Sequence, residues 1–153
     1  MNILATLCYL QKDGQTLMIC PHNKKNIEYN GRWNGLGGKI QNGETPEECT
    51  IREVFEESNL RIKKLQLARF LTFSKIFKNE DWYCFVYKST DFSGKLKESE
   101  EGNLEWVKNE EVLKRNLWEG DHVFLPYIFS DKLFSGKFFY DKGKLLKHSI
   151  NTL

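Results

Sequence analysis

The chain has 153 residues, of which 40% are hydrophobic and 14% aromatic, which is typical of a folded protein with a buried core and excludes a disordered segment. Its 23 basic and 21 acidic residues leave a net charge of only +2, so composition gives no support for an extended polyanion-binding surface. No apolar run approaches the roughly 20 residues that a membrane-spanning helix needs.

These features predict a cytoplasmic protein with no membrane partner and no stable nucleic-acid complex. Residues 1–7 are apolar but short and lack a basic leader. The four cysteines show no CxxC spacing and are expected to be reduced and mostly buried, while the three histidines are scattered and form no metal motif. We expect one domain, residues 1–153, present as a monomer or homodimer.

Runs rich in β-branched and aromatic residues, bounded by turn-forming residues, predict most of the secondary structure. The expected strands are residues 3–10, 16–20, 62–77, 82–87 and 104–107, followed by a terminal hairpin from 138–140 and 145–146. Short helices are predicted over 109–115, with Asn109 as its cap, and over 121–131, where Pro126 could kink the chain. Residues 21–31 are predicted to form a loop, in which Lys24 and Lys25 either contact phosphate or are simply solvated.

The helix expected after Thr45 is specified by strong local signals. Thr45, Pro46 and Glu48 occupy the N-cap, N1 and N3 positions of a capping box. Asn59 can end the helix because asparagine tolerates the left-handed conformation. The apolar side is predicted to consist of Ile51, Val54 and Phe55, with Cys49 as a further candidate.

Three carboxylates share another face of this helix. Glu53, Glu56 and Glu57 are three and four residues apart, a spacing that places them together. They could form an ordinary solvated acidic face, or they could bind a hard cation such as Mg²⁺ or Mn²⁺. The glycine-rich residues 32–40 directly precede the helix and allow backbone to approach a ligand closely. Together these features indicate metal-dependent cleavage of a phosphoanhydride, without identifying the base or the leaving group.

The segment from Gly38 to Leu60 resembles the Nudix box, Gx5Ex7REUxEExGU, where U is aliphatic. Every specified position matches except Asn59, which stands where the family usually has glycine. Asparagine can supply the same positive φ, so the resemblance implies intact chemistry at a modest cost in stability.

The Nudix resemblance implies an α/β (α+β) fold, an α/β/α sandwich around a mixed sheet, and hydrolysis of nucleoside diphosphates linked to another group. It implies Mg²⁺, with Mn²⁺ as a substitute. By position, the metal ligands are Glu53, Glu56, Glu57 and the Gly37 carbonyl. Arg52 would orient the glutamates with Glu44 as its partner, although a plain structural salt bridge is compatible with that role. Glu101 matches an additional family glutamate, which binds metal or helps deprotonate water; the alternative is a surface-loop glutamate.

Within the family, the chain resembles the MutT/MutX-like 8-oxo-dGTP diphosphatases. Residues 31–39 are similar to a GRWNGFGGK run of the animal members, and residues 117–122 parallel their purine-pocket segment. The implied substrate-binding residues are Thr6, Lys25, Asn34, Gly37, Gly38, Lys39, Trp118 and Asp121.

The resemblance also implies how the base would be held. Asn34 would read the base edge, Trp118 would be an aromatic wall, and Asp121 would meet purine N–H donors. The animal enzymes have two adjacent aspartates where this chain has Gly120-Asp121, so their breadth toward several oxidised purines does not transfer. A core tryptophan is the alternative for Trp118. Phe73 and Trp82 could also face the base, although core packing is the default expectation for both.

Three functions remain in competition at this point. The first is a Mg²⁺-dependent pyrophosphatase that converts an oxidised purine nucleotide, 8-oxo-dGTP, into 8-oxo-dGMP and pyrophosphate by attack of water on the β-phosphorus. The second is hydrolysis of another nucleotide, a dinucleotide or an RNA 5′-triphosphate end. The third is a non-catalytic nucleotide-binding module, which the complete set of box glutamates argues against.

Overall fold

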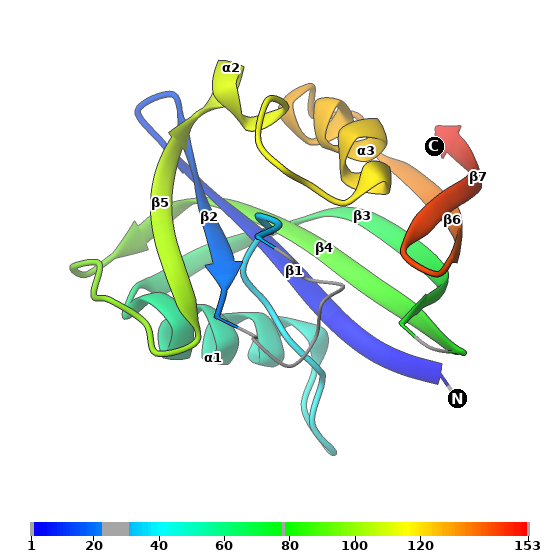
Figure 1. The fold of residues 1–153 in the computed structure, drawn as a ribbon. Helices are drawn as coiled ribbons and strands as arrows, with labels where there is room; N and C mark the ends of the chain where they lie inside the picture. The colour runs from blue at the N-terminus through cyan, green and yellow to red at the C-terminus, as the bar shows by residue number, and fades with distance from the viewer. Residues whose placement is uncertain (1, 23–30, 78, 153) are drawn as a thin grey trace.

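A computed structural model describes residues 2–22, 31–77 and 79–152, and its ribbon is drawn in Figure 1. Lys24 and Lys25 lie outside the described residues. The elements in chain order are β1 (Asn2–Lys12), β2 (Gln15–Pro21), α1 (Pro46–Ser58), β3 (Arg61–Phe77), β4 (Glu80–Ser93), β5 (Gly102–Lys108), α2 (Asn109–Val112), α3 (Glu119–Phe129), β6 (Phe134–Asp141) and β7 (Lys144–Thr152). None of the helices in this described part is long and apolar enough to cross a membrane.

The strands form a seven-stranded mixed sheet in the order β5-β2-β1-β4-β3-β6-β7. Its parallel pairs are β1 with β4 and β3 with β6, and the other neighbours are antiparallel. In Figure 1, α1 lies on one side of the sheet and α3 on the other. The α/β/α arrangement around a mixed sheet is therefore confirmed.

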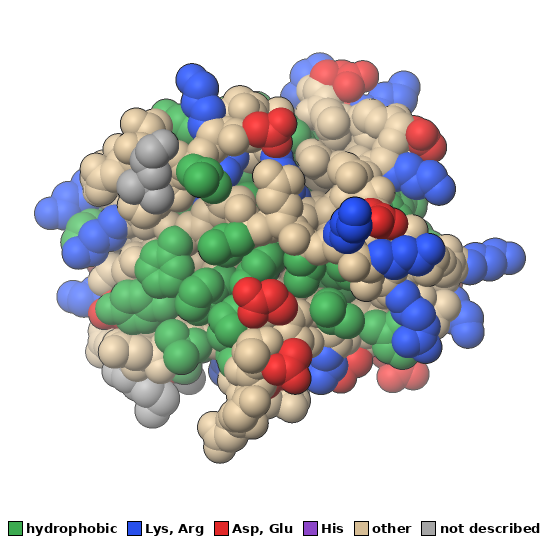
Figure 2. All heavy atoms as spheres, turned by 180° about the vertical axis from the view of Figure 1, so that it is seen from behind, with side chains coloured by type: hydrophobic (Ala, Val, Ile, Leu, Met, Phe, Trp, Pro, Cys, Tyr) green, Lys and Arg blue, Asp and Glu red, His purple; other side chains and the backbone are tan. Residues whose placement is uncertain are grey.

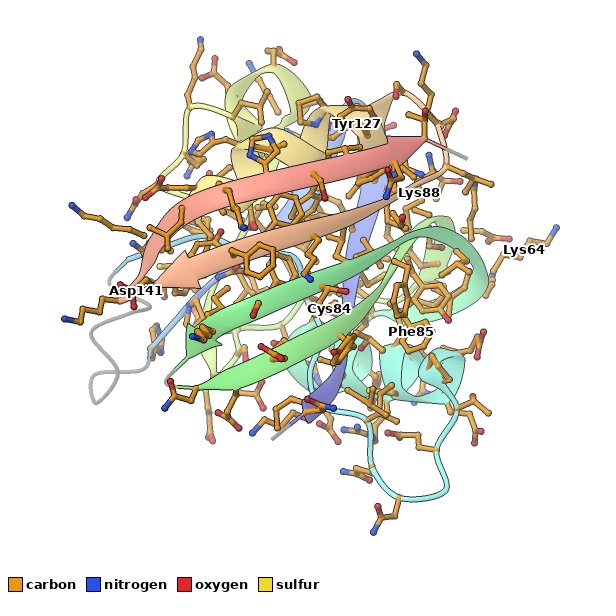
Figure 3. The ribbon with its side chains drawn as sticks, turned by 90° about the vertical axis from the view of Figure 1, so that its right-hand side faces the viewer. Lys64, Cys84, Phe85, Lys88, Tyr127 and Asp141 are labelled. Carbon is orange, nitrogen blue, oxygen red and sulfur yellow. The ribbon has the colours of Figure 1, made fainter. Side chains whose placement is uncertain are left out.

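Side chains of the central strand β4 alternate between the two faces, as a strand requires. Cys84 and Val86 pack with α3 residues in one core cluster, whereas Phe85 and Tyr87 belong to a second cluster that includes Val54 of α1. Figure 3 shows the same division, with Lys88 and Tyr127 on the α3 side and Phe85 toward α1. The sheet therefore separates two cores, and all four cysteines are free, three of them buried.

The two faces of the sheet are not covered equally. On the α1 side, Leu4 is 53%, Leu67 51% and Phe70 40% exposed. An apolar area that includes a few acidic side chains is visible in Figure 2. Ile51 of α1 is 42% exposed, so its assignment to the buried side of the helix was wrong. Helix α1 covers only part of its face and buries Cys49, Thr50, Val54, Glu57 and Ser58 instead.

Two predicted helices differ in detail from the structure. Asn109 does not cap α2, because Lys108 is the N-cap residue and Asn109 is the first helical residue. The side chain of Asn109 instead accepts a hydrogen bond from the Thr16 hydroxyl at 2.7 Å, so a tertiary contact replaced the local cap. Helix α3 begins two residues earlier than predicted and contains Pro126. The terminal hairpin is confirmed, with longer strands than expected.

Candidate active site

Helix α1 begins with the predicted capping box. The Thr45 hydroxyl accepts from the Glu48 N–H at 3.0 Å, and the Glu48 carboxylate accepts from the Thr45 N–H at 3.2 Å. Asn59 ends the helix in the left-handed conformation with φ 68°. This confirms the prediction that asparagine adopts the positive φ for which the family usually has glycine at this position. These local interactions fix the direction in which the helix presents its glutamates.

Three carboxylates meet between α1 and the loop before β5. Glu53, Glu57 and Glu101 each place a carboxylate oxygen within 4.8 Å of the others. The buried Glu57 accepts a hydrogen bond from the Gly37 N–H at 2.8 Å. A Cβ on Gly38 would lie 2.4 Å from Glu53 Cδ, so a side chain here would displace the Glu53 carboxylate. The glycine-rich segment therefore packs directly against the carboxylates.

Burial dominates the protonation of this cluster. Loss of hydration raises the pKa of Glu57 to about 8, repulsion from Glu101 and Glu53 adds to the increase, and the Gly37 N–H opposes it. Burial also raises the pKa of Glu53, with Arg52 opposing. A divalent cation would relieve both the burial cost and the repulsion, and an all-oxygen donor set suits Mg²⁺ or Mn²⁺. The residues present therefore fit such an ion.

Arg52 joins the helix to the turn that precedes it. Its Nε and Nη2 donate to the two Glu44 oxygens at 2.6 and 2.9 Å, and its Nη1 donates to Glu53 at 2.8 Å. The Arg52 hydrogen bond lowers the pKa of Glu44 to about 2. The ion pair with Glu44 is thus structural, and the bond to Glu53 also orients a carboxylate of the cluster.

Glu56 stands apart from the other box glutamates. Its side chain is 48% exposed and lies 3.3 Å from Arg52 Nη1. It is not part of the Glu53, Glu57 and Glu101 cluster. The structure thus brings Glu101 together with two of the three α1 glutamates predicted to bind metal. The ligand roles of all four glutamates and of the Gly37 carbonyl stay predictions.

A cavity of about 560 Å³ adjoins the carboxylate cluster. Its lining includes Glu57, Glu101 and the Gly37–Gly38–Lys39 segment, together with Asn34, Trp118 and Asp121. Thr6 also lines it and donates its backbone N–H to the Gly38 carbonyl at 2.9 Å. The predicted substrate-binding residues therefore line one cavity, apart from Lys25, which is outside the described residues.

Strands β3 and β4 supply an apolar wall that the sequence did not assign to the site. Phe73, Ile76, Trp82 and Cys84 line the cavity, and Phe73 pairs directly with Trp82 across the strands. Core packing was the default expectation for Phe73 and Trp82. Their alternating positions in neighbouring strands are the signal that could have placed them on one face. Trp118 is 3% exposed, so it is a buried side chain and a cavity wall at once.

The cavity lining also includes polar groups suited to a heterocycle. Burial raises the pKa of Asp121 to about 8, and the Arg32 charge opposes the increase. Asn34 Nδ2 is buried without a hydrogen-bond partner in the described part of the chain, although both backbone groups of Asn34 pair with Ile19 at 2.8 Å. A buried donor without a partner is costly, so this amide is available to a ligand.

Stability of the metal-free protein is expected to fall as pH rises. The folded-state pKa of Glu57 is about 8 against 4.5 unperturbed, so the folded state binds more protons than the unfolded chain between these values. The contribution of protonated Glu57 to the free energy of unfolding is present at low pH and disappears toward pH 8. The free energy of unfolding should fall by up to about 1.4 kcal/mol per pH unit in this range.

Urea unfolding in EDTA between about pH 5 and pH 8 measures this effect. The difference between wild type and Glu57→Gln should change steadily across that range, because glutamine does not titrate. Saturating Mg²⁺ should reduce the decline in the wild type, since the ion binds the ionised carboxylates. A constant difference between the two proteins in EDTA would contradict the elevated Glu57 pKa.

Comparison with known proteins identifies the family. The model of the NUDIX domain matches residues 1–128. The chain belongs to the NUDIX family. Oxidized purine nucleoside triphosphate hydrolases are similar to it: the mouse protein is 33% identical over 80% of both chains, and the zebrafish (Danio rerio) protein is 29% identical over 98% of this chain and 95% of its own.

The solved structures agree. A MutT protein from Bacillus halodurans superposes with a TM-score of 0.84 at 29% identity and covers 97% of both chains. The chain is therefore a Nudix hydrolase, and the resemblance noted in its sequence is confirmed. Nudix hydrolases act on small nucleotide substrates and generally use divalent metals, which agrees with the acidic cluster.

Proposed function

We propose that this Nudix hydrolase is a Mg²⁺-dependent pyrophosphatase that converts 8-oxo-dGTP into 8-oxo-dGMP and pyrophosphate, removing an oxidised precursor from the nucleotide pool. The observation that carries the proposal is that a single cavity connects the carboxylate cluster with Asn34, Trp118 and Asp121. The mouse and zebrafish relatives, which are oxidized purine nucleoside triphosphate hydrolases, support this substrate class.

The base is assigned to the part of the cavity lined by Asn34, Trp118 and Asp121. The Asn34 amide offers a donor and an acceptor to the base edge, and the Asp121 carboxyl group faces purine N–H donors. Trp118 supplies an aromatic face, on which stacking contributes roughly 1–3 kcal/mol per base. Phe73 and Trp82 add apolar surface to the cavity lining, which would help to exclude water from the base site.

The phosphate chain is assigned to the glycine segment and the carboxylates. Glu53, Glu57 and Glu101, assisted by Glu56 and the Gly37 carbonyl, would hold Mg²⁺, for which Mn²⁺ could substitute. The ion would neutralise phosphate charge and promote ionisation of the attacking water. Arg52, held by Glu44, keeps the Glu53 carboxylate oriented. Lys39 and Lys25 are proposed to contact phosphate, and water attacks the β-phosphorus.

We also propose that residues 1–153 form one Nudix domain. The family match ends at residue 128, but β6 pairs with β3 and so continues the same sheet. We propose a small nucleotide substrate as the binding partner, and a monomer or a homodimer as the oligomeric state. We place the protein in the cytoplasm.

Steady-state hydrolysis with pyrophosphate detection tests the substrate assignment. We expect kcat/KM for 8-oxo-dGTP to exceed that for dGTP by at least about tenfold, because buried polar groups discriminate between base edges. If the two kcat/KM values were about equal, the proposed role in removing oxidised nucleotides would be refuted, whereas the proposed pyrophosphatase activity would stand. Faster pyrophosphate release from triphosphorylated RNA would favour the RNA-end alternative.

A further inference from the structure

Arg32 supports the ring that forms the aromatic wall of the cavity. Its guanidinium carbon lies 4.1 Å from the centroid of the Trp118 ring. The same ring meets Tyr140 edge-on, with centroids 5.9 Å apart and planes at 89°. Trp118 is the N-cap residue of α3 and is 3% exposed, so its ring is held in a packed environment in which Arg32 and Tyr140 contact it directly.

The position of Arg32 relative to the cavity indicates how it acts. Trp118 lines the cavity, whereas Arg32 is not among the lining residues. The guanidinium therefore contacts the ring from outside the space assigned to the base. A cation over an indole face is attracted by the ring quadrupole, most strongly where water is excluded. This contact holds the plane of Trp118 without occupying the base position.

Arg32 also acts on the second base-site residue of α3. Asp121 lies in the first turn of the helix and is 4% exposed. The positive charge of Arg32 opposes the effect of burial on the pKa of the Asp121 carboxyl group. A single side chain thus interacts with both the aromatic wall and the carboxyl group proposed to read the base.

We propose that Arg32 is a positioning residue that sets affinity for the oxidised purine by fixing Trp118 and interacting with Asp121. This inference rests on the proposed function, because it needs a purine in this part of the cavity. It assigns no part in the cleavage step to Arg32, so a change there should affect binding and leave the rate of bond breaking almost intact.

The chain offers a matched control in the neighbouring pair of Arg115 and Trp33. The guanidinium carbon of Arg115 lies 5.3 Å from the Trp33 ring centroid, and Arg115 also forms an ion pair with Glu105. Trp33 does not line the cavity. Arg115→Met therefore removes a similar cation from a similar ring, with consequences for stability alone.

Binding of 8-oxo-dGMP by calorimetry, together with steady-state hydrolysis of 8-oxo-dGTP, tests the proposal. Arg32→Met is expected to weaken binding and raise KM by about tenfold while kcat changes by less than about twofold. Arg32→Lys keeps the charge but not the planar group, so we expect about threefold weaker binding. It also serves as the second variant if Arg32→Met does not fold. Arg115→Met should bind 8-oxo-dGMP like the wild type.

Two results would overturn the proposal in distinguishable ways. If Arg32→Met, or Arg32→Lys in its place, binds 8-oxo-dGMP as tightly as Arg115→Met does, then Arg32 does not position the base site and the proposed function stands. If the wild type neither binds 8-oxo-dGMP nor hydrolyses its triphosphate, the proposed function fails, and this inference fails with it.

Discussion

Replacing Glu57 with glutamine is expected to lower kcat by roughly 10³-fold or more while the fold is retained. Glutamine keeps the shape of the side chain and can still accept the Gly37 N–H, which lies 2.8 Å from Glu57 Oε1. It removes the negative charge that the cluster with Glu53 and Glu101 offers to a cation. Steady-state hydrolysis at saturating Mg²⁺ measures the loss of activity.

Thermal unfolding separates this chemical effect from misfolding. Without Mg²⁺ at about pH 8, Glu57→Gln should be at least as stable as the wild type, because a repelling buried carboxylate is gone. Mg²⁺ should stabilise the wild type more than the variant. Glu110→Gln, an exposed change in α2, is the control and should retain full activity. Wild-type turnover by Glu57→Gln would refute the assignment of the metal site.

Gly37→Ala is expected to destabilise the protein by at least about 3 kcal/mol and to abolish activity. A Cβ at this position would lie 2.0 Å from the Thr6 carbonyl oxygen, and the glycine has φ 152°. Relief would require the backbone to move away from β1, which would withdraw the Gly37 N–H from Glu57. Urea unfolding measures the stability, and the hydrolysis assay measures the activity.

Gly14→Ala is the control that separates the steric clash at Gly37 from the effect of positive φ alone. Gly14 also has positive φ, 73°, but no heavy atom lies within 4 Å of its built Cβ. We expect this control to lose about 1 kcal/mol of unfolding free energy and to keep its activity. Equal losses in both variants would show that the close approach of Gly37 to β1 has no special importance.

The parts of the structure that were predicted correctly depend on local chemistry. The start of α1 follows from Thr45, Pro46 and Glu48, which need only each other to form the capping box. Its end follows from Asn59, and the β1–β2 and β6–β7 hairpins follow from turn residues between strand-forming runs. The fold class and the family could therefore be predicted from the sequence, because the motifs that identify them are local.

Features that depend on long-range packing were predicted less well. Ile51 is exposed because α1 covers only part of its sheet face, which helical spacing alone does not show. Asn109 bonds Thr16, which lies 93 residues away in the sequence. Phe73 and Trp82 line the cavity because β3 and β4 pair in one register, which their own sequences do not specify. The support of Trp118 by Arg32 depends on the same kind of tertiary placement.

Hydrolysis of 8-oxo-dGTP in water enriched with ¹⁸O tests the central claim most directly. With Mg²⁺ present, mass spectrometry of the products is predicted to show unlabelled 8-oxo-dGMP and pyrophosphate that carries one ¹⁸O atom, as attack on the β-phosphorus requires. Label in 8-oxo-dGMP would contradict attack at that phosphorus. Release of orthophosphate and 8-oxo-dGDP, or no dependence on Mg²⁺, would contradict the account of the site itself.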